Sequence, residues 1–163
     1  MTPDPFTSDG RRADAERGTD GQVAKSVRHL LSEDRTCELL GIQVESAADG
    51  RARARMRVRP DMVNGHAIGH GGFTFTLADS AFAFACNSYN RSTVAAACEI
   101  RFLAPTRLGD VLVAEAVERS RAGRDGVYDI TVRRADTVVA ECAGRSKERR
   151  GPRFDAGPGA EEG

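Results

Sequence analysis

The sequence predicts an α+β protein in which a curved antiparallel sheet wraps around one long central helix. Three observations lead to this prediction. Residues 73–86 carry a single formal charge, Asp79, as expected of a helix that is buried on nearly every side. Residues 51–59 alternate strictly between arginine and small or apolar side chains, which is the pattern of a half-buried strand. Residues 94–147 read as four further strands, and these must form the curved sheet around the helix.

Length and composition limit the classes of protein that fit. The chain has 163 residues, which suits one domain, and its 24 basic residues balance 24 acidic ones. A formal net charge of zero gives no reason to expect nucleic acid or a membrane as a partner. No apolar run could span a bilayer and the N-terminus lacks a signal-peptide core, so we expect a cytoplasmic protein. The cysteines at 37, 86, 98 and 142 lack metal-site spacing, so neither a metal nor a disulfide is predicted.

A single folded domain is expected at residues 22–150. Residues 1–21 and 151–163 hold few apolar side chains, so burial could not offset the entropy of ordering them, and we predict two disordered tails. Periodicity and turn signals then divide the domain into helices and strands. Helices are predicted at 22–32, 34–40 and 71–89, strands at 42–47, 51–59, 94–103, 111–119, 127–134 and 137–147, and a hairpin loop at 120–126.

The arginines of residues 51–59 all fall on one face of their strand. A nucleic-acid surface is one interpretation of this stripe. The zero net charge and the absence of interleaved aromatic residues for base stacking argue against it. We favour a solvated face whose arginines pair with acids on a neighbouring strand or subunit.

Glycines stand at the start of the central helix. Gly71 and Gly72 follow His70, and the first N–H groups of a helix lack internal partners and carry the positive end of the dipole. Such N–H groups can polarise a carbonyl oxygen as an oxyanion hole, and Asn64 and His70 supply polar groups nearby. Taken alone, His-Gly-Gly fits a plain loop leading into a helix equally well.

Asp79 is the charged residue of this apolar helix. A carboxylate in apolar surroundings tends to have a raised pKa and can serve as a base or nucleophile. The alternatives are a buried acid that braces a neighbouring loop and a helix rotated to bring Asp79 to solvent. Asp79 lies eight residues after Gly71, about 12 Å along one helix. One chain therefore does not easily bring Gly71 and Asp79 to the same substrate atom. A two-fold pair of antiparallel helices does, because each Asp79 can face Gly71 of the other chain. This geometry predicts a site at a dimer interface.

The stretch from Asn64 to Asn87 resembles the hotdog-fold acyl-CoA thioesterases. An asparagine, a His-Gly-Gly and a Leu-Ala-Asp stand at 64, 70–72 and 77–79, at the spacing of that family. The resemblance covers about residues 30–150 and, within the family, points to the phenylacetyl-CoA thioesterases of phenylacetate degradation.

The resemblance implies a hotdog fold, assembled as dimers and usually tetramers. It implies hydrolysis of an acyl-CoA, phenylacetyl-CoA or a ring-hydroxylated form, to the free acid and coenzyme A. By position, the Gly71 N–H would polarise the thioester carbonyl, and Asp79 of the partner chain would act as nucleophile or as general base on water. Asn64 and His70 would orient the substrate and the attacking group. No cofactor is implied, because coenzyme A is part of the substrate.

The resemblance also indicates the residues that contact substrate. Related thioesterases often have a serine or threonine near the start of the strand after the helix, which helps to hold the water. Here alanines occupy positions 95–97, so either Thr93 substitutes or the site lacks that hydroxyl. Three basic residues could bind the phosphates of coenzyme A, although each fits ordinary surface charge as well. The predicted substrate contacts are Gly72, Phe75, Arg91, Thr93, Ala95, Arg145 and Lys147.

Two other functions fit parts of the pattern. A non-catalytic acyl-CoA-binding module would need Asp79 only for structure, and the presence of Asp79 together with His70 and Gly71 argues against it. A hotdog hydratase or dehydratase would pair a histidine with an acid, but the Gly-Gly context of His70 fits the thioesterase pattern better. The acyl group and the tetramer arrangement stay open.

Overall fold

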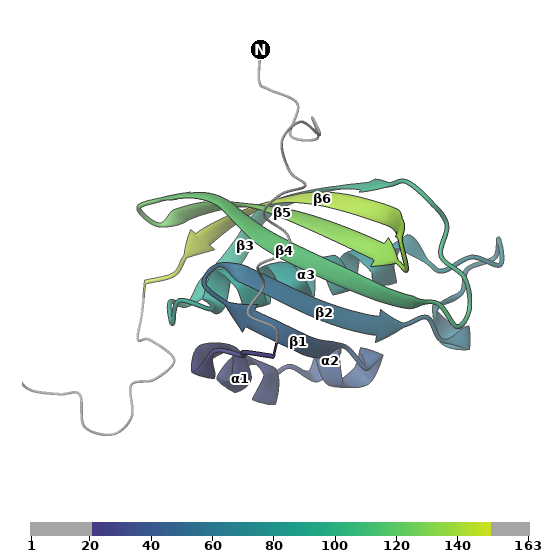
Figure 1. Ribbon diagram of the computed structural model, residues 1–163, viewed down its shortest axis with the longest axis horizontal. Coiled ribbons are helices and arrows are strands. Elements are labelled where there is room, and N and C mark those ends of the chain that lie inside the picture. The colour runs from purple at the N-terminus through teal and green to yellow at the C-terminus, as the bar shows by residue number, and fades with distance from the viewer. Residues whose placement is uncertain (1–20, 151–163) are drawn as a thin grey trace, which may run out of the picture.

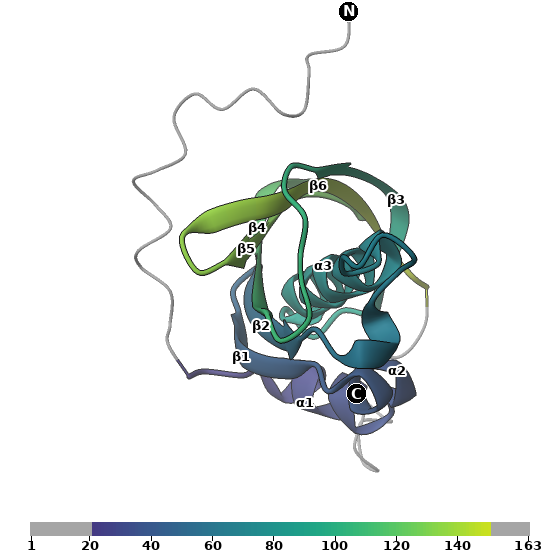
Figure 2. The same cartoon turned by 90° about the vertical axis from the view of Figure 1, so that its right-hand side faces the viewer.

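A computed structural model describes residues 21–150, so the predicted tails at 1–21 and 151–163 lie outside the described residues, apart from Gly21. One antiparallel sheet curls around the long helix α3, Gly71–Asn87, as the end-on view shows (Figure 2). The short helices α1, Lys25–Ser32, and α2, Arg35–Leu40, lie outside the curl beside β1 (Figure 1). This architecture confirms the predicted fold class.

The sheet has six strands in the order β1-β2-β4-β5-β6-β3. Their bounds are β1 Gln43–Ala48, β2 Arg51–Arg57, β3 Thr93–Phe102, β4 Val111–Ala122, β5 Asp125–Arg134 and β6 Thr137–Glu148. β3 precedes β4 in sequence but pairs with β6, with Cys98 opposite Gly144. β3 is therefore an edge strand, and its other side carries backbone groups without a partner in the sheet.

Two predicted boundaries were wrong. Val23, expected in the first helix, forms a bridge with Ala47, and the helix begins at Lys25. The expected hairpin loop at 120–126 is mostly strand, because β4 and β5 continue to a two-residue turn at Gly123 and Arg124, where Gly123 has φ +58°. Residues 119–125 are exposed, so their polarity reflects a solvated hairpin and not a loop.

β2 confirms the alternation read from the sequence. Its small and apolar side chains are buried against α3, while its arginines point outward. Arg53 pairs with Glu45 at 2.6 Å and with Glu115, and Arg55 lies 3.6 Å from Glu45. Two arginines of the stripe are thus paired with acids on the neighbouring strands β1 and β4, while Arg57 donates to the Gly109 carbonyl and Arg59 pairs with Asp61. Within residues 21–150, no helix is both long and apolar enough to span a bilayer.

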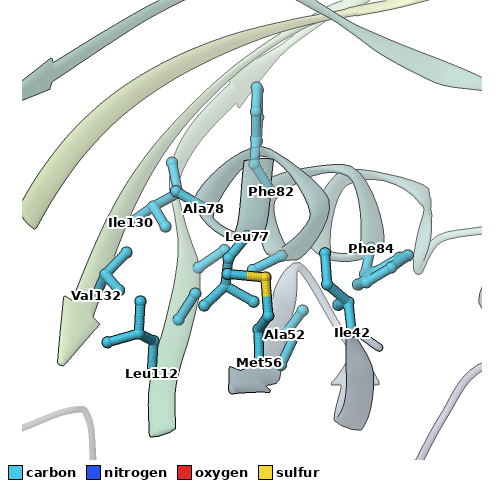
Figure 3. Close-up of a cluster of buried hydrophobic side chains, with 14 of the residues drawn as sticks. Ile42, Ala52, Met56, Leu77, Ala78, Phe82, Phe84, Leu112, Ile130 and Val132 are labelled. Carbon is cyan, nitrogen blue, oxygen red and sulfur yellow. The ribbon is translucent and has the colours of Figure 1, made fainter. Parts of the chain in front are cut away.

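The core lies between α3 and the concave face of the sheet. Leu77, Phe82 and Phe84 are fully buried, and Figure 3 shows Leu77 pointing among side chains of β2, β4 and β5 and Phe84 lying beside Ile42. The Phe82 ring packs on Tyr128 of β5 and lies against Gly144 of β6. Another side of α3 is only partly buried, and it carries Phe75, Thr76, Asp79, Ser80 and Ala83. The prediction that this helix is buried on nearly every side was therefore wrong for the single chain. The sheet stops at β3, and no further strand formed by residues 21–150 covers the helix there.

Candidate functional site

The loop that leads into α3 is organised by Asn64. The Asn64 Oδ1 accepts hydrogen bonds from the backbone N–H of His66 at 2.9 Å and of Ile68 at 3.4 Å. The Asn64 backbone N–H in turn donates to the Ile68 carbonyl at 2.8 Å. The Asn64 Nδ2 group has no acceptor among residues 21–150. It is therefore the part of this side chain that can donate to a substrate.

His70 is the N-cap of α3. Its Nδ1 accepts a hydrogen bond from the Gly72 N–H at 3.0 Å, and its own backbone N–H donates to the Met62 carbonyl at 2.7 Å. The Gly72 N–H is consequently occupied by the protein itself. The exposed imidazole keeps Nε2 for an external partner.

Gly71 presents the remaining N–H at this end of the helix. No residue in the described range 21–150 accepts a hydrogen bond from it. A side chain at Gly71 would meet the Phe102 ring, because an added Cβ would lie 3.0 Å from the Phe102 Cζ. The Phe102 ring, 55% exposed, therefore lies over the glycine that is proposed to bind the carbonyl. The sequence prediction did not assign Phe102 to the site, although an aromatic residue at the end of the strand after the helix was a usable signal.

Asp79 is partly buried on the open side of α3. Burial raises the pKa of its carboxyl group, and a contact from the Cys98 thiol offsets part of that rise. The Cys98 Sγ lies 3.9 Å from Asp79 Oδ1. No lysine, arginine or histidine in the described range forms an ion pair with Asp79. A carboxylate in this setting is more basic than an ordinary aspartate, which suits a base or a nucleophile.

β3 runs beside α3 and contacts it at two separate positions. Phe102 contacts Gly71 at one point and Cys98 contacts Asp79 at the other. Phe102 lies four positions after Cys98, about 13 Å along the strand, which matches about 12 Å for eight positions along the helix. Within one chain, Gly71 and Asp79 thus lie at two separate positions along α3.

Thr93 lies far from Asp79 of its own chain. Its hydroxyl donates to the Arg91 carbonyl at 2.9 Å, and five strand residues, about 16 Å, separate Thr93 from Cys98. Thr93 and Arg91 instead line a small hollow at the start of β3, together with Arg121 and Arg124. Within one chain, the Thr93 hydroxyl therefore does not replace a hydroxyl at Asp79.

The predicted phosphate contacts differ in how they are engaged. Arg91 lies 3.2 Å from Glu148, and Lys147 lies 2.7 Å from Asp125. Arg145 is exposed and has no ion-pair partner among residues 21–150. Its neighbour Gly144 faces Phe82 on the concave side, so Arg145 and Lys147 point to the convex side. One chain does not bring them together with Gly71 and Asp79.

The other predicted contacts lie along the open side of α3 and on β3. Phe75 is one turn from Asp79 and partly buried, and Ala95 is exposed on β3 opposite Ser146. In the described part of the chain, no three histidine, cysteine or acidic side chains converge as metal ligands.

Comparison with known proteins shows the family of this chain. The family model described as Thioesterase superfamily matches residues 66–141. The acyl-coenzyme A thioesterase PaaI of Escherichia coli K12 is 44% identical over 120 residues, which cover 72% of this chain and 86% of that protein.

Solved structures show the same fold. The E. coli PaaI protein from the phenylacetic acid degradation operon superposes with a TM-score of 0.76 at 40% identity, covering 77% of this chain and 92% of that one. A mutant of the phenylacetic acid degradation protein PaaI from Thermus thermophilus gives 0.69 at 34% identity, covering 71% and 100%. The curved sheet around α3 is thus the hotdog fold of these proteins. The chain belongs to the thioesterase superfamily and is a thioester-hydrolysing enzyme of that family.

Proposed function

We propose that this enzyme hydrolyses acyl-CoA thioesters, with phenylacetyl-CoA or a ring-hydroxylated phenylacetyl-CoA as substrate. The observation that carries the proposal is Asp79, a partly buried carboxylate with a raised pKa and no cationic partner in the described range, on the helix whose first N–H is unoccupied. The similarity to PaaI, named an acyl-coenzyme A thioesterase and encoded in a phenylacetic acid degradation operon, supports the substrate class.

In the proposed mechanism, the Gly71 N–H donates to the thioester carbonyl oxygen and stabilises the negative charge that develops there. Asp79 of the partner chain then acts in one of two ways. It attacks the carbonyl carbon, expelling the thiolate and forming an anhydride that water cleaves, or it takes a proton from a water that attacks the same carbon. In both cases the C–S bond breaks. In the first route coenzyme A leaves as the thiolate, which solvent water protonates, and in the second the proton that Asp79 takes from the water passes to the sulfur. Asn64 and His70 orient the substrate and the attacking group through Nδ2 and Nε2.

The proposed site needs two chains. β3 ends the sheet, and its edge carries Val94, 46% exposed, followed by exposed alanines at 95–97. An exposed apolar edge strand beside an uncovered side of α3 is a surface that a second copy can cover. A two-fold axis there would make the two α3 helices antiparallel and bring Asp79 of one chain toward Gly71 of the other. We propose a homodimer on this basis, and a homotetramer of two such dimers.

The substrate assignment is tested by steady-state hydrolysis of a panel of acyl-CoA esters, with free coenzyme A recorded by a thiol-reactive dye. We expect the highest kcat/KM on arylacetyl-CoA esters. Asp79→Asn should lower kcat by about 100-fold or more, since a positioned base contributes at least that much. Asp136→Asn, in the exposed turn after β5, is the matched control and should keep wild-type turnover. Uniformly low rates together with tight binding of every ester would favour a binding module instead.

A further inference from the structure

Two cysteine thiols, those of Cys98 and Cys142, interact with Asp79. The Cys98 Sγ, on the side of β3 that faces α3, donates to Asp79 Oδ1 at 3.9 Å. Cys142 on β6 is buried, and its thiol interacts electrostatically with that of Cys98. These three side chains, Cys142, Cys98 and Asp79, come from β6, β3 and α3 in that order.

This contact is the polar support that the protein itself provides for the Asp79 side chain. Among residues 21–150, Cys98 is the one side chain that donates to this carboxylate. Two further features hold Cys98 in place. Its backbone is paired with Gly144 in the sheet, and the Phe82 ring packs against Gly144 from α3, since an added Cβ there would lie 2.9 Å from the ring.

We propose that Cys98 is a positioning residue, whose S–H holds the Asp79 carboxylate in the orientation needed to attack the substrate or to take a proton from water. The proposal rests on the proposed catalytic role of Asp79. Without the contact, the carboxylate would rotate about its side-chain torsions on the open side of α3, and fewer encounters with substrate would have the productive geometry.

The groups around Asp79 determine how its titration should respond. The titratable side chains that interact with it are thiols, namely Cys86 on α3 itself, Cys98 on β3 and Cys142 on β6. Burial raises the Asp79 pKa and the Cys98 contact lowers it. Removing the donor while keeping the side-chain bulk should therefore raise the Asp79 pKa further.

Three variants distinguish the effect of losing the Cys98 hydrogen bond from the effect of altered side-chain packing. Cys98→Val keeps the approximate volume and removes the donor, whereas Cys98→Ser restores an O–H donor. Cys37→Val is the matched control, because the buried Cys37 thiol makes the same kind of contact, 3.8 Å, to Ser80, the residue after Asp79. Each variant is checked for a wild-type melting profile, and kcat, KM and the pH dependence of kcat/KM are then measured on the best acyl-CoA substrate.

We expect Cys98→Val to lower kcat about two- to fivefold with KM nearly unchanged, because a thiol is a weak hydrogen-bond donor. The acid limb of its kcat/KM profile should move to higher pH. Cys98→Ser should recover kcat and return the limb to the wild-type position or below it, and Cys37→Val should behave as wild type. Equal profiles for Cys98→Val and Cys98→Ser, whether both normal or both impaired, would overturn the proposal.

A second readout does not depend on turnover. The Asp79 carboxyl carbon is titrated by NMR in the wild type and in both Cys98 variants. A higher pKa in Cys98→Val than in Cys98→Ser supports the contact, and identical titrations refute it. A wild-type enzyme that hydrolyses no acyl-CoA ester would refute the proposed function, and the titration would still decide whether Cys98 holds Asp79.

Discussion

At the scale of single residues, Asp79 has two opposing effects on the protein. Burial of its carboxyl group raises the pKa, which makes the group a better base near neutral pH. The same burial makes the ionised form unfavourable in the folded state, so the residue that serves catalysis should cost stability. The contact from the Cys98 thiol lowers the Asp79 pKa and so offsets a part of this loss of stability.

This trade-off predicts the effect of Asp79→Asn on stability. An acid whose pKa is raised on folding binds its proton more tightly in the folded state, so its contribution to stability is present below the ordinary value of 3.8 and is lost as the pH rises through the raised pKa. Asp79→Asn should thus melt at a higher temperature than wild type near neutral pH while losing activity. The difference in melting temperature should shrink as the pH is lowered toward 3.8. Scanning calorimetry across this range tests the prediction, and a variant that is less stable at neutral pH would contradict it.

At the scale of elements, the register between α3 and β3 decides which residues meet. Asn87, buried at the end of α3, donates from Nδ2 to the Ala83 and Thr93 carbonyls at 2.8 Å each and accepts from the Thr93 N–H at 2.9 Å. This ties the end of the helix to the start of the strand. From that anchor the two elements run side by side, so that Cys98 reaches Asp79 and Phe102 reaches Gly71.

The packing of β6 on α3 makes Gly144 a sensitive position. An alanine Cβ there would lie 2.9 Å from two atoms of the buried Phe82 ring, which also packs on Tyr128 at 5.2 Å between ring centroids. Gly144→Ala should lower the free energy of unfolding by about 1–3 kcal/mol, as measured by denaturant titration, because an overfilled core has to shift. Gly65→Ala is the control, since no atom lies within 4 Å of its Cβ position and its φ is ordinary. A neutral Gly144→Ala would show that Phe82 can move at little cost.

At the scale of the whole molecule, the proposed site is divided between two copies of the chain. The roughly 12 Å between Gly71 and Asp79 along α3 is a consequence of helical geometry and cannot be shortened within one chain. A two-fold pairing through the β3 edge would create two equivalent sites, each with Gly71 from one protomer and Asp79 from its partner.

Mixing two inactive variants tests this division. Gly71→Val forces the Phe102 ring away and crowds the N–H, while Asp79→Asn removes the reactive carboxylate. Each variant alone should be nearly inactive. After co-expression in equal amounts, random assortment should restore about one quarter of wild-type activity, because half of the chains supply an intact Gly71 and half an intact Asp79. The control pair, Asp79→Asn with Asp79→Ala, should recover nothing. No recovery from the first pair would place Gly71 and Asp79 in the same chain's site.

The sequence by itself determined the features that depend on local residue patterns. Alternation over 51–59 predicted β2 and its outward arginines, and the uncharged run around Asp79 predicted α3. The motif residues from Asn64 to Asp79 predicted the family, since their types and spacing are properties of the chain alone.

Only the tertiary structure decided how distant segments meet. It placed β3 at the edge beside β6, left one side of α3 open, assigned the Gly72 N–H to His70 and brought the Cys98 thiol to Asp79. The physical reason is that periodicity reports which face of an element is apolar, whereas strand order and side-chain contacts depend on how the whole core packs. The separation of Gly71 and Asp79 was therefore readable in the sequence, and the thiol that holds Asp79 was not.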